Sequence, residues 1–267
     1  MGKFEFNTKH GITEFTFDTF EEFIEYITEK ELEHPAYIYR GQQCEWKIFS
    51  TLRRYMDKYE YLQRVQDLTK QHMDNFKYSI RDRADLQNRS IKTLEDDEIW
   101  SLGQHEGLAT PLIDWTYSPF VASFFAFAET DLKHDQSEYR IIYSLHKKTV
   151  EKKVEELNKK NPKDDFIIKF ITPLEFYHSR LINQRGLHIK IPLHIDVENW
   201  VREIFLNEPP KNGSVFTKFK IKNSERTKIL KILSRMNISH LNLFPDMSGS
   251  SKFCNMSLEI KNYSYNK

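Results

Sequence analysis

The spacing of apolar residues predicts an amphipathic helix near the start of the chain and one or two more after it. Glu22 follows Thr19 by three residues, the spacing of a capping box, and an apolar stripe runs from Phe20 to Ile27 behind it. Residues 58–89 carry spaced apolar side chains among many charged ones. That pattern is typical of helices with one face on the surface.

Three further helices are indicated by their end signals. Residues 100–107 predict a short helix that ends at Gly107. Ser118 followed by Pro119 is a start signal, and the helix that it opens, over residues 120–130, is apolar nearly all round and is therefore expected to be buried. Ser224 is predicted to cap a helix whose inward side chains are Ile229, Ile232, Leu233 and Met236.

Alternating and β-prone stretches predict strands between these helices. They cover residues 36–39, 139–145, 166–171, 187–191 and 215–221. Residues 147–165 are charged and predict a helix or a loop. Because strands and helices are mixed and no break resembles a domain boundary, the predicted fold class is α+β, as a single domain over residues 1–267 with a central mixed or antiparallel sheet flanked by helices.

Composition and charge narrow the class of protein. The 267 residues are 39% hydrophobic and 30% charged, which is typical of a globular chain. The net charge of +1 gives no global basic excess for holding nucleic acid, and a local basic groove stays open as the alternative. Two cysteines without metal spacing, and no apolar run of about 18 residues, favour a cytoplasmic protein with no metal and no membrane span.

The first candidate for chemistry is the stretch Tyr39-Arg40-Gly41-Gln42 at the end of a predicted strand. The guanidinium fork of Arg40 suits phosphate or carboxylate groups. Gly41 lets the backbone pass close to another group. Tyr39, Gly41 and Gln42 are therefore candidate binding residues beside Arg40. From spacing alone, a surface arginine before a turn glycine is the alternative.

Two more candidate stretches carry an imidazole and amides. Gln104 and His105 come just before the predicted helix end at Gly107. An imidazole there can act as a general base, a phosphate donor or a helix cap. For His105 the alternative is a cap or a satisfied core residue. Gln184 precedes the strand predicted at 187–191, and its amide both donates and accepts hydrogen bonds.

Polar side chains also gather where a predicted strand passes into the buried helix. Asp114 and Thr116 stand at this junction, where free helix N–H groups favour an anion, and Trp115 between them offers a flat face to a ring. Thr110 and Ser118 flank the junction as further binding candidates. Turn and cap hydrogen bonds are the alternative role for Asp114 and Thr116. The chain has no Gly-rich phosphate loop, zinc-spaced Cys/His cluster or Gly-x-Ser-x-Gly elbow, so the usual evidence for ATPases, zinc hydrolases and serine hydrolases is missing.

Together these stretches resemble the FRG domain family. The motifs follow in the family's order over about residues 19–255. Tyr39-Arg40-Gly41 is similar to the (F/Y)RG signature, Gln104-His105 with Thr110 to Pro119 and Phe125-Ala126 to the longest motif, and Asn183 to Gly186 and Leu243 to Asp246 to two later ones. The family usually has an arginine where Pro111 stands, so an anion contact is either lost here or supplied elsewhere.

The resemblance extends by analogy to the fold of ADP-ribosyltransferases. In many of those enzymes a first strand ends in Arg-Gly, a second strand leads into a helix, and a third motif carries a catalytic glutamate. The analogy implies that Arg40 holds the pyrophosphate or ribose of NAD and that Trp115 or Tyr39 supports the nicotinamide ring. Gln184 falls near the third motif, and because it has no charge, Asp114 would stabilise the positive charge that develops on the ribose.

Three functions follow for such a site, each with an anionic small molecule or nucleotide as ligand. The first is an ADP-ribosyltransferase-like enzyme that uses NAD to modify a protein or nucleic acid, as a bacterial toxin or antiphage defence effector; its catalytic candidates are Arg40, His105, Asp114 and Gln184. The second is a non-catalytic module for a nucleotide or phosphorylated ligand, which the uncharged Gln184 favours. The third is a nucleic-acid-processing enzyme with Arg40, His105 and Asp114 as phosphate clamp, acid and base, which the balanced charge disfavours.

Overall fold

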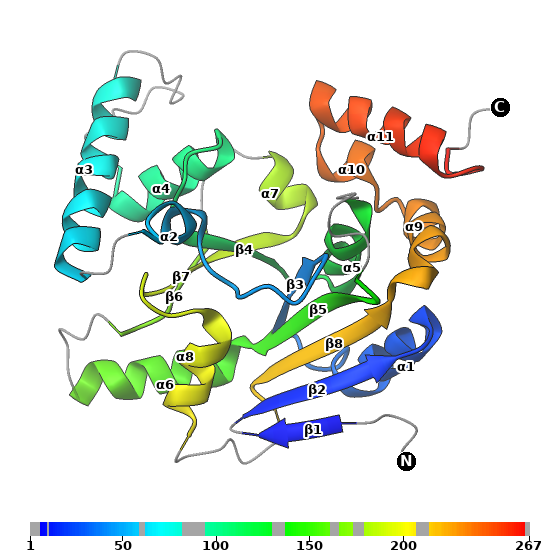
Figure 1. The fold of residues 1–267 in the computed structure, drawn as a ribbon, viewed down its shortest axis with the longest axis horizontal. Coiled ribbons are helices and arrows are strands. Elements are labelled where there is room, and N and C mark those ends of the chain that lie inside the picture. Colours follow the sequence, from blue (N-terminus) through cyan, green and yellow to red (C-terminus); the bar gives the residue numbers. More distant parts are fainter. Residues whose placement is uncertain are drawn as a thin grey trace.

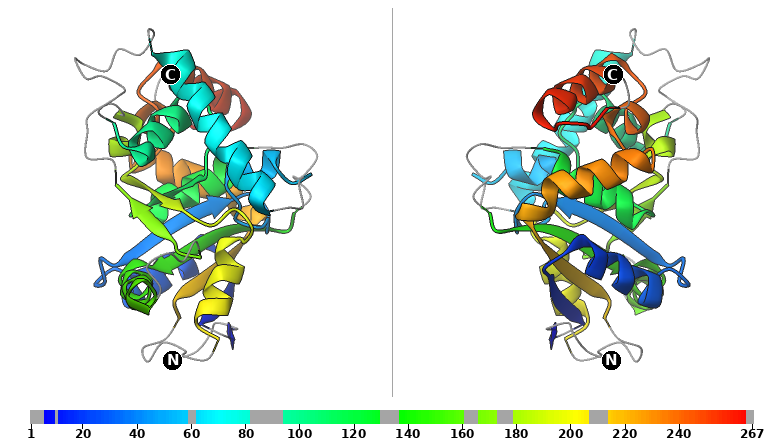
Figure 2. Two further views of the ribbon diagram at one scale, coloured as in Figure 1. Left: turned by 90° about the vertical axis from the view of Figure 1, so that its left-hand side faces the viewer. Right: turned by 90° about the vertical axis from the view of Figure 1, so that its right-hand side faces the viewer.

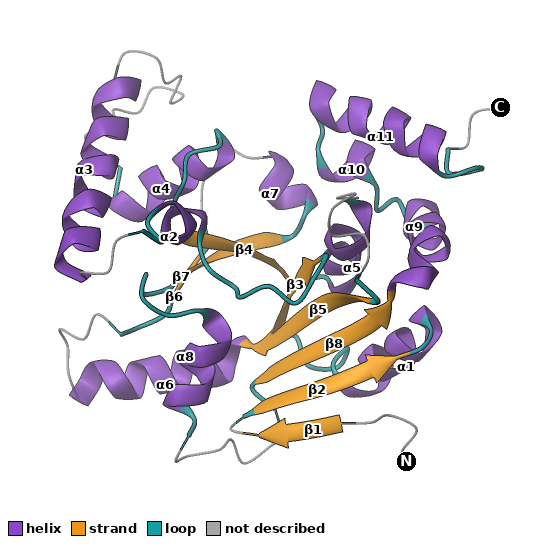
Figure 3. Cartoon of the chain, in the orientation of Figure 1, coloured by secondary structure: helices purple, strands orange, loops and turns teal. Residues whose placement is uncertain are grey.

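Eight strands form one sheet through the centre of the described part of the molecule (Figure 1; Figure 3). The computed structural model describes residues 6–9, 11–58, 62–81, 94–129, 137–160, 166–172, 179–206 and 214–264. The strands are β1 (Phe6–Lys9), β2 (Ile12–Phe17), β3 (Tyr37–Gln42), β4 (Leu112–Thr116), β5 (Tyr139–His146), β6 (Lys169–Ile171), β7 (Gly186–Lys190) and β8 (Phe216–Lys222). They lie in the order β1-β2-β8-β5-β3-β4-β7-β6, parallel between β2 and β8 and antiparallel elsewhere. The predicted α+β class, with a mixed sheet, is confirmed.

Helices cover both faces of this sheet. They are α1 (Phe20–Lys30), α2 (Thr51–Tyr55), α3 (Leu62–Ile80), α4 (Asp96–His105), α5 (Pro119–Ala128), α6 (Lys147–Lys160), α7 (Ser179–Asn183), α8 (Val197–Ile204), α9 (Arg226–Arg235), α10 (His240–Leu243) and α11 (Met247–Glu259), with a 3-10 turn at Asn223–Glu225. Helices α1, α5 and α9 pack on one face, and α6 and α8 pack on the other. The C-terminal helices lie at the end of the molecule opposite the N-terminus (Figure 2). No helix in the described ranges combines the length and apolar character that crossing a membrane requires.

Several predicted elements are confirmed with shifted ends. The capping box at Thr19 is present, and Ser118 caps α5 by accepting from the backbone N–H of Val121 at 3.2 Å. The strand predicted at 36–39 extends through Gln42, so the arginine and glycine lie inside β3 rather than after it. The charged stretch predicted as a helix or loop is α6 as far as Lys160. The ends of the stretch 58–89, beyond α3, lie largely outside the described residues.

One predicted helix end and one inward residue were wrong. Ser224 lies within the 3-10 turn, and Glu225 occupies the N-cap position of α9. Met236 is 49% exposed because α9 ends at the residue before it, whereas Leu230 is fully buried. The turn shifts the helix start by two residues, which rotates the apolar face relative to the expected one.

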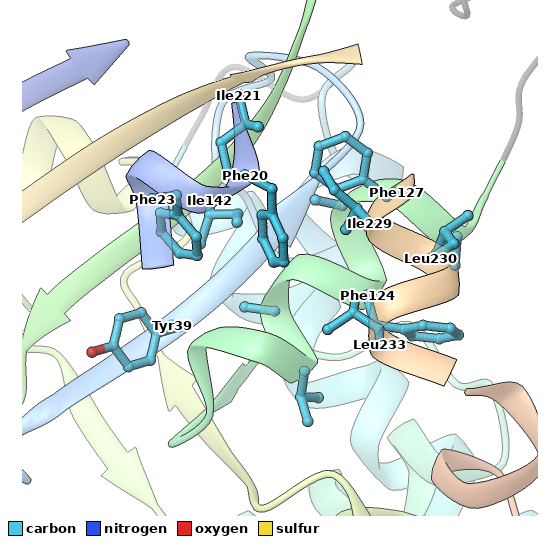
Figure 4. Close-up of a cluster of buried hydrophobic side chains, with 14 of the residues drawn as sticks. Phe20, Phe23, Tyr39, Phe124, Phe127, Ile142, Ile221, Ile229, Leu230 and Leu233 are labelled. Carbon is cyan, nitrogen blue, oxygen red and sulfur yellow. The ribbon is translucent and has the colours of Figure 1, made fainter. Parts of the chain in front are cut away.

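The largest core cluster lies between the sheet and α1, α5 and α9 (Figure 4). Phe20, Phe124, Phe127 and Ile229 are fully buried there. The closest approach in this layer is between β3 and α5. A Cβ atom built on Gly41 would lie 1.9 Å from the carbonyl oxygen of Ala122 in α5, which no side chain tolerates. The glycine after the arginine therefore exists to let a helix, rather than a ligand, approach the strand.

A buried carboxyl supports the opposite end of β3. Glu31 is 3% exposed, and the hydroxyl of Ser144 donates to its two carboxyl oxygens at 3.1 and 3.2 Å. The hydroxyl of Tyr39 forms a further hydrogen bond with it. Burial raises the pKa of Glu31 to about 7, although both hydrogen bonds act in the opposite direction.

This raised pKa predicts a loss of stability with rising pH. Because the pKa of Glu31 is higher in the folded protein than its ordinary 4.5, its contribution is complete below pH 4.5 and is lost as the pH rises through 7. We expect the free energy of unfolding in urea to fall across this range, and Glu31→Gln to remove that part of the slope. Glu29→Gln, on the exposed face of α1, is the control and should keep it. Equal slopes for the wild type and Glu31→Gln would contradict a neutral Glu31.

Candidate functional site

The sheet opens between β3 and β4 (Figure 1). These neighbours share one residue pair, Tyr39 with Thr116, whereas β3 and β5 share six pairs and β4 and β7 share five. Beyond that pair the strands diverge, and the backbone groups on their facing edges lose their ladder partners. Arg40 crosses the gap, and its Nη1 donates to the backbone oxygen of Asp114 at 2.6 Å. The opening places a guanidinium and a carboxylate on its two sides.

Arg40 is held in place from behind. Its Nε donates to Gln42 Oε1 at 3.3 Å, and the Nε2 of the buried Gln42 donates to the backbone oxygen of Trp46 at 2.9 Å. Its Nη2 donates to no residue in the described ranges. Burial and the nearby Arg54 lower the pKa of Arg40, and the charge of Asp114 partly offsets this; a guanidinium stays charged at neutral pH regardless. One nitrogen of a fixed cation is therefore available to a ligand.

Asp114 is an ionised carboxylate with one occupied oxygen. Its Oδ1 accepts from Gln104 Nε2 at 2.5 Å and from His188 Nδ1 at 3.0 Å. Burial acts to raise the pKa of Asp114, but the hydrogen bond and charge of His188, the charge of Arg40 and the Gln104 amide outweigh it and hold the pKa below 3.8. Its Oδ2 accepts from no described residue, and the side chain is 66% exposed. The free oxygen is a ready acceptor or charge.

The partners of Asp114 are themselves oriented. The hydroxyl of Thr110 donates to Gln104 Oε1, which turns the amide so that its nitrogen faces the carboxylate. His188 lies directly opposite Asp114 in the antiparallel ladder of β4 and β7. Because a carboxylate oxygen only accepts, Nδ1 carries the hydrogen, and Nε2 lies 3.2 Å from the hydroxyl of Ser101 on α4. The carboxylate is thus fixed from two elements.

Two surface cavities meet at Arg40 and Asp114, which line both. The larger, of about 290 Å³, is lined in addition by Tyr39, Gly41, Trp115, Thr116, Phe125, Gln184 and Phe244. The smaller, of about 210 Å³, is lined in addition by Phe49, Thr51, Arg54, Gln104, Gly107, Leu108, Leu112 and Ile113. A guanidinium and a carboxylate at the junction, with aromatic and amide groups on the walls, suit a ligand that carries both an anionic group and a ring.

The later motifs complete the larger cavity. Gln184 Nε2 donates to the backbone oxygen of Leu243 at 3.1 Å, and the backbone oxygen of Gln184 accepts from the hydroxyl of Thr116 at 2.6 Å. Phe244 stands edge-on to Phe125, with ring centroids 6.0 Å apart. Neither ring is fully buried, so the pair forms a partly open aromatic wall beside Gln184.

Not every predicted site residue reaches the cavities. His105, at the end of α4, is absent from both linings, and its Nε2 lies 3.9 Å from Glu106 Oε1. Gln42 and Thr110 are buried and orient Arg40 and Gln104, and Ser118 caps α5. Tyr39 and Trp115 line the larger cavity, but each is 3% exposed and belongs to a core cluster. The remaining predicted residues, Arg40, Gly41, Gln104, Asp114, Thr116 and Gln184, meet at the opening.

Sequence reasoning missed His188, Arg54 and the two phenylalanines. His188 sits on the polar face of a strand that alternates, which was a usable signal, but only the register of β4 and β7 places it opposite Asp114. Arg54 follows a chain region with no regular pattern. Phe125 and Phe244 stood within motifs without a stated role, and their pairing depends on where α10 ends against α5.

Comparison with known proteins identifies the middle of the chain. Residues 35–136 match the family model described as the FRG domain, so the family expected from the sequence is confirmed. The match includes β3, β4 and α5, and with them Arg40, Gln104 and Asp114. His188 and Phe244 lie outside it. No curated protein and no solved structure matches the chain, so the likeness to ADP-ribosyltransferases stays a prediction.

Proposed function

We propose that this chain, whose residues 35–136 form an FRG domain, binds NAD in the opening between β3 and β4 and transfers ADP-ribose from it to a macromolecular acceptor. The observation that carries the proposal is the pair of unoccupied polar atoms on the two sides of that opening. Arg40 Nη2 and Asp114 Oδ2 have no partner among the described residues, although every other polar atom of these two side chains has one. Fixed groups with free atoms are what a binding site requires.

The two groups suit opposite parts of one dinucleotide. A guanidinium fork binds phosphate oxygens, so Arg40 is assigned to the diphosphate. Asp114 is negative at neutral pH and is assigned to the ribose that bears nicotinamide, where its free oxygen accepts a hydroxyl hydrogen or faces the reacting carbon. Phe125 and Phe244 offer the partly exposed rings against which nicotinamide would pack, a role that the sequence had assigned to Trp115 or Tyr39.

The reaction follows from a carboxylate held next to a ribose. The bond between C1′ of the ribose and the ring nitrogen of nicotinamide breaks, and its electron pair leaves with nicotinamide as a neutral molecule. Positive charge develops on the ribose and is stabilised by the Asp114 carboxylate. A nucleophilic oxygen or nitrogen of the acceptor then bonds to C1′ and loses its proton to solvent. Gln184, beside the same cavity, contributes an uncharged amide oxygen.

A second candidate function is binding without chemistry. Asp114 is the one carboxylate among the residues that line the two cavities, and Gln184 occupies the place where the analogy puts a catalytic glutamate. Incubation with NAD labelled in the nicotinamide ring separates the two functions. Release of labelled nicotinamide supports transfer, and bound but intact NAD over many hours supports a binding module.

We expect Arg40→Ala to weaken NAD binding by about 10- to 100-fold, because a charge-assisted contact to phosphate is lost. Arg40→Lys should be nearly as impaired, since lysine keeps the charge without the fork. Isothermal titration calorimetry measures the Kd, and the increase in Tm with NAD gives an independent measure. Lys30→Ala, which removes an exposed cation at the end of α1, is the control. Wild-type affinity in Arg40→Ala would exclude the opening as the NAD site.

A further inference from the structure

The smaller cavity contains a second arginine. Arg54, on α2, lines it together with Arg40, and the two charges are close enough for Arg54 to lower the pKa of Arg40. Two guanidinium groups that face one cavity repel each other, which costs stability unless something negative lies between them. Such an arrangement indicates a place for an anion.

The neighbouring arginine shows the contrast. Arg53 forms an ion pair with Asp57 at 3.0 Å and lies over the ring of Phe49, 5.4 Å from its centroid. The side chain of Arg54 is exposed and forms no hydrogen bond or ion pair with any residue in the described ranges. The protein thus neutralises one of two adjacent arginines and leaves the one that faces the cavity without a counter-charge.

The acidic group in this cavity does not fill that place. Asp114 is the one carboxylate in the lining, and its Oδ1 is turned toward Gln104 and His188. Arg40 reaches the backbone oxygen of Asp114 rather than its carboxylate. Arg40 Nη2 and the whole fork of Arg54 therefore stay available to one ligand.

We propose that the smaller cavity is a diphosphate subsite and that Arg54 is a binding residue for it, which rests on the proposed function in naming the dinucleotide. Arg54 then supplies the cation that family members carry where this chain has Pro111. Pro111 itself lines a different cavity, beside α3, and contributes nothing here. A dinucleotide across the junction places its phosphates between Arg40 and Arg54, while its nicotinamide end reaches Phe125 and Phe244 in the larger cavity.

The test compares Arg54→Gln with Arg53→Gln in the full chain, using four probes: NAD, ADP-ribose, inorganic pyrophosphate and nicotinamide riboside. We expect Arg54→Gln to weaken the three diphosphate probes about 10-fold and to leave nicotinamide riboside unchanged. Arg53→Gln should bind all four as the wild type does. The Tm of Arg54→Gln without ligand should not fall, because a repulsion is removed, and its dependence of log Kd on salt should be weaker.

The outcomes separate the subsite from the proposed function. Equal NAD affinity in the wild type and Arg54→Gln overturns the subsite and leaves NAD transfer standing. Loss of nicotinamide riboside binding together with the diphosphates also overturns it, because the effect then does not act through phosphate. Pyrophosphate and ADP-ribose that bind through Arg54, with NAD neither bound nor consumed, support the subsite and overturn the proposed function. Failure of the wild type to bind any probe overturns both.

Discussion

Replacing Gly41 by alanine is expected to lower the free energy of unfolding by about 3 kcal/mol or more. The new methyl group would lie 1.9 Å from the carbonyl oxygen of Ala122 and 2.6 Å from the backbone nitrogen of Ala126, and both are backbone atoms of α5 that cannot rotate away. Either α5 moves off the sheet or β3 leaves its register. For a chain of this size the Tm should fall by about 6–12 °C, measured by circular dichroism.

Gly107→Ala is the matched control for this substitution. Gly107 has a φ of 88°, so alanine there is strained, but nothing lies within 4 Å of the added atom. Its cost should be about 1 kcal/mol, from the backbone alone. A similar small loss at Gly41 would show that β3 and α5 are not in backbone contact. In that case the strand would not hold Arg40 where the site requires it.

The parts of the fold that depend on local signals were predictable. The capping box at Thr19, the Ser118–Pro119 start of α5 and the alternation of β7 each depend on residues within a few positions of one another. The strand order and the opening between β3 and β4 depend on contacts between distant segments, which no local pattern specifies. The start of α9 failed because a 3-10 turn competed with the expected serine cap.

The site shows the same division between residue type and arrangement. The sequence singled out Arg40, Asp114 and Gln184 as chemically suitable, and the structure places all three around one opening. It chose His105 as the imidazole, whereas the imidazole that contacts the carboxylate is His188, from a strand 74 residues after Asp114. Gly41 was assigned to ligand approach and instead serves helix packing. Motif order identifies which residues matter, but register and packing decide what each one does.

Asp114→Asn is expected to reduce the release of nicotinamide from NAD by about 10²–10³-fold while the Kd for NAD changes by only a few-fold. Asparagine keeps an oxygen that can accept from Gln104 and His188, so the geometry around it is preserved, but the charge opposite the developing positive ribose is gone. Turnover of labelled NAD at saturating concentration measures the first effect, and calorimetry measures the second.

Glu106→Gln, one residue after His105 and outside both cavity linings, removes a nearby charge as the control and should leave turnover unchanged. The pKa of Asp114 lies below its usual range, so the wild-type carboxylate stays ionised at neutral pH and its titration should not limit turnover there. Undiminished turnover in Asp114→Asn would mean that a group outside these two cavities carries the charge. Because no other lining residue is acidic, that result would remove the reaction from this opening and leave it a site for binding alone.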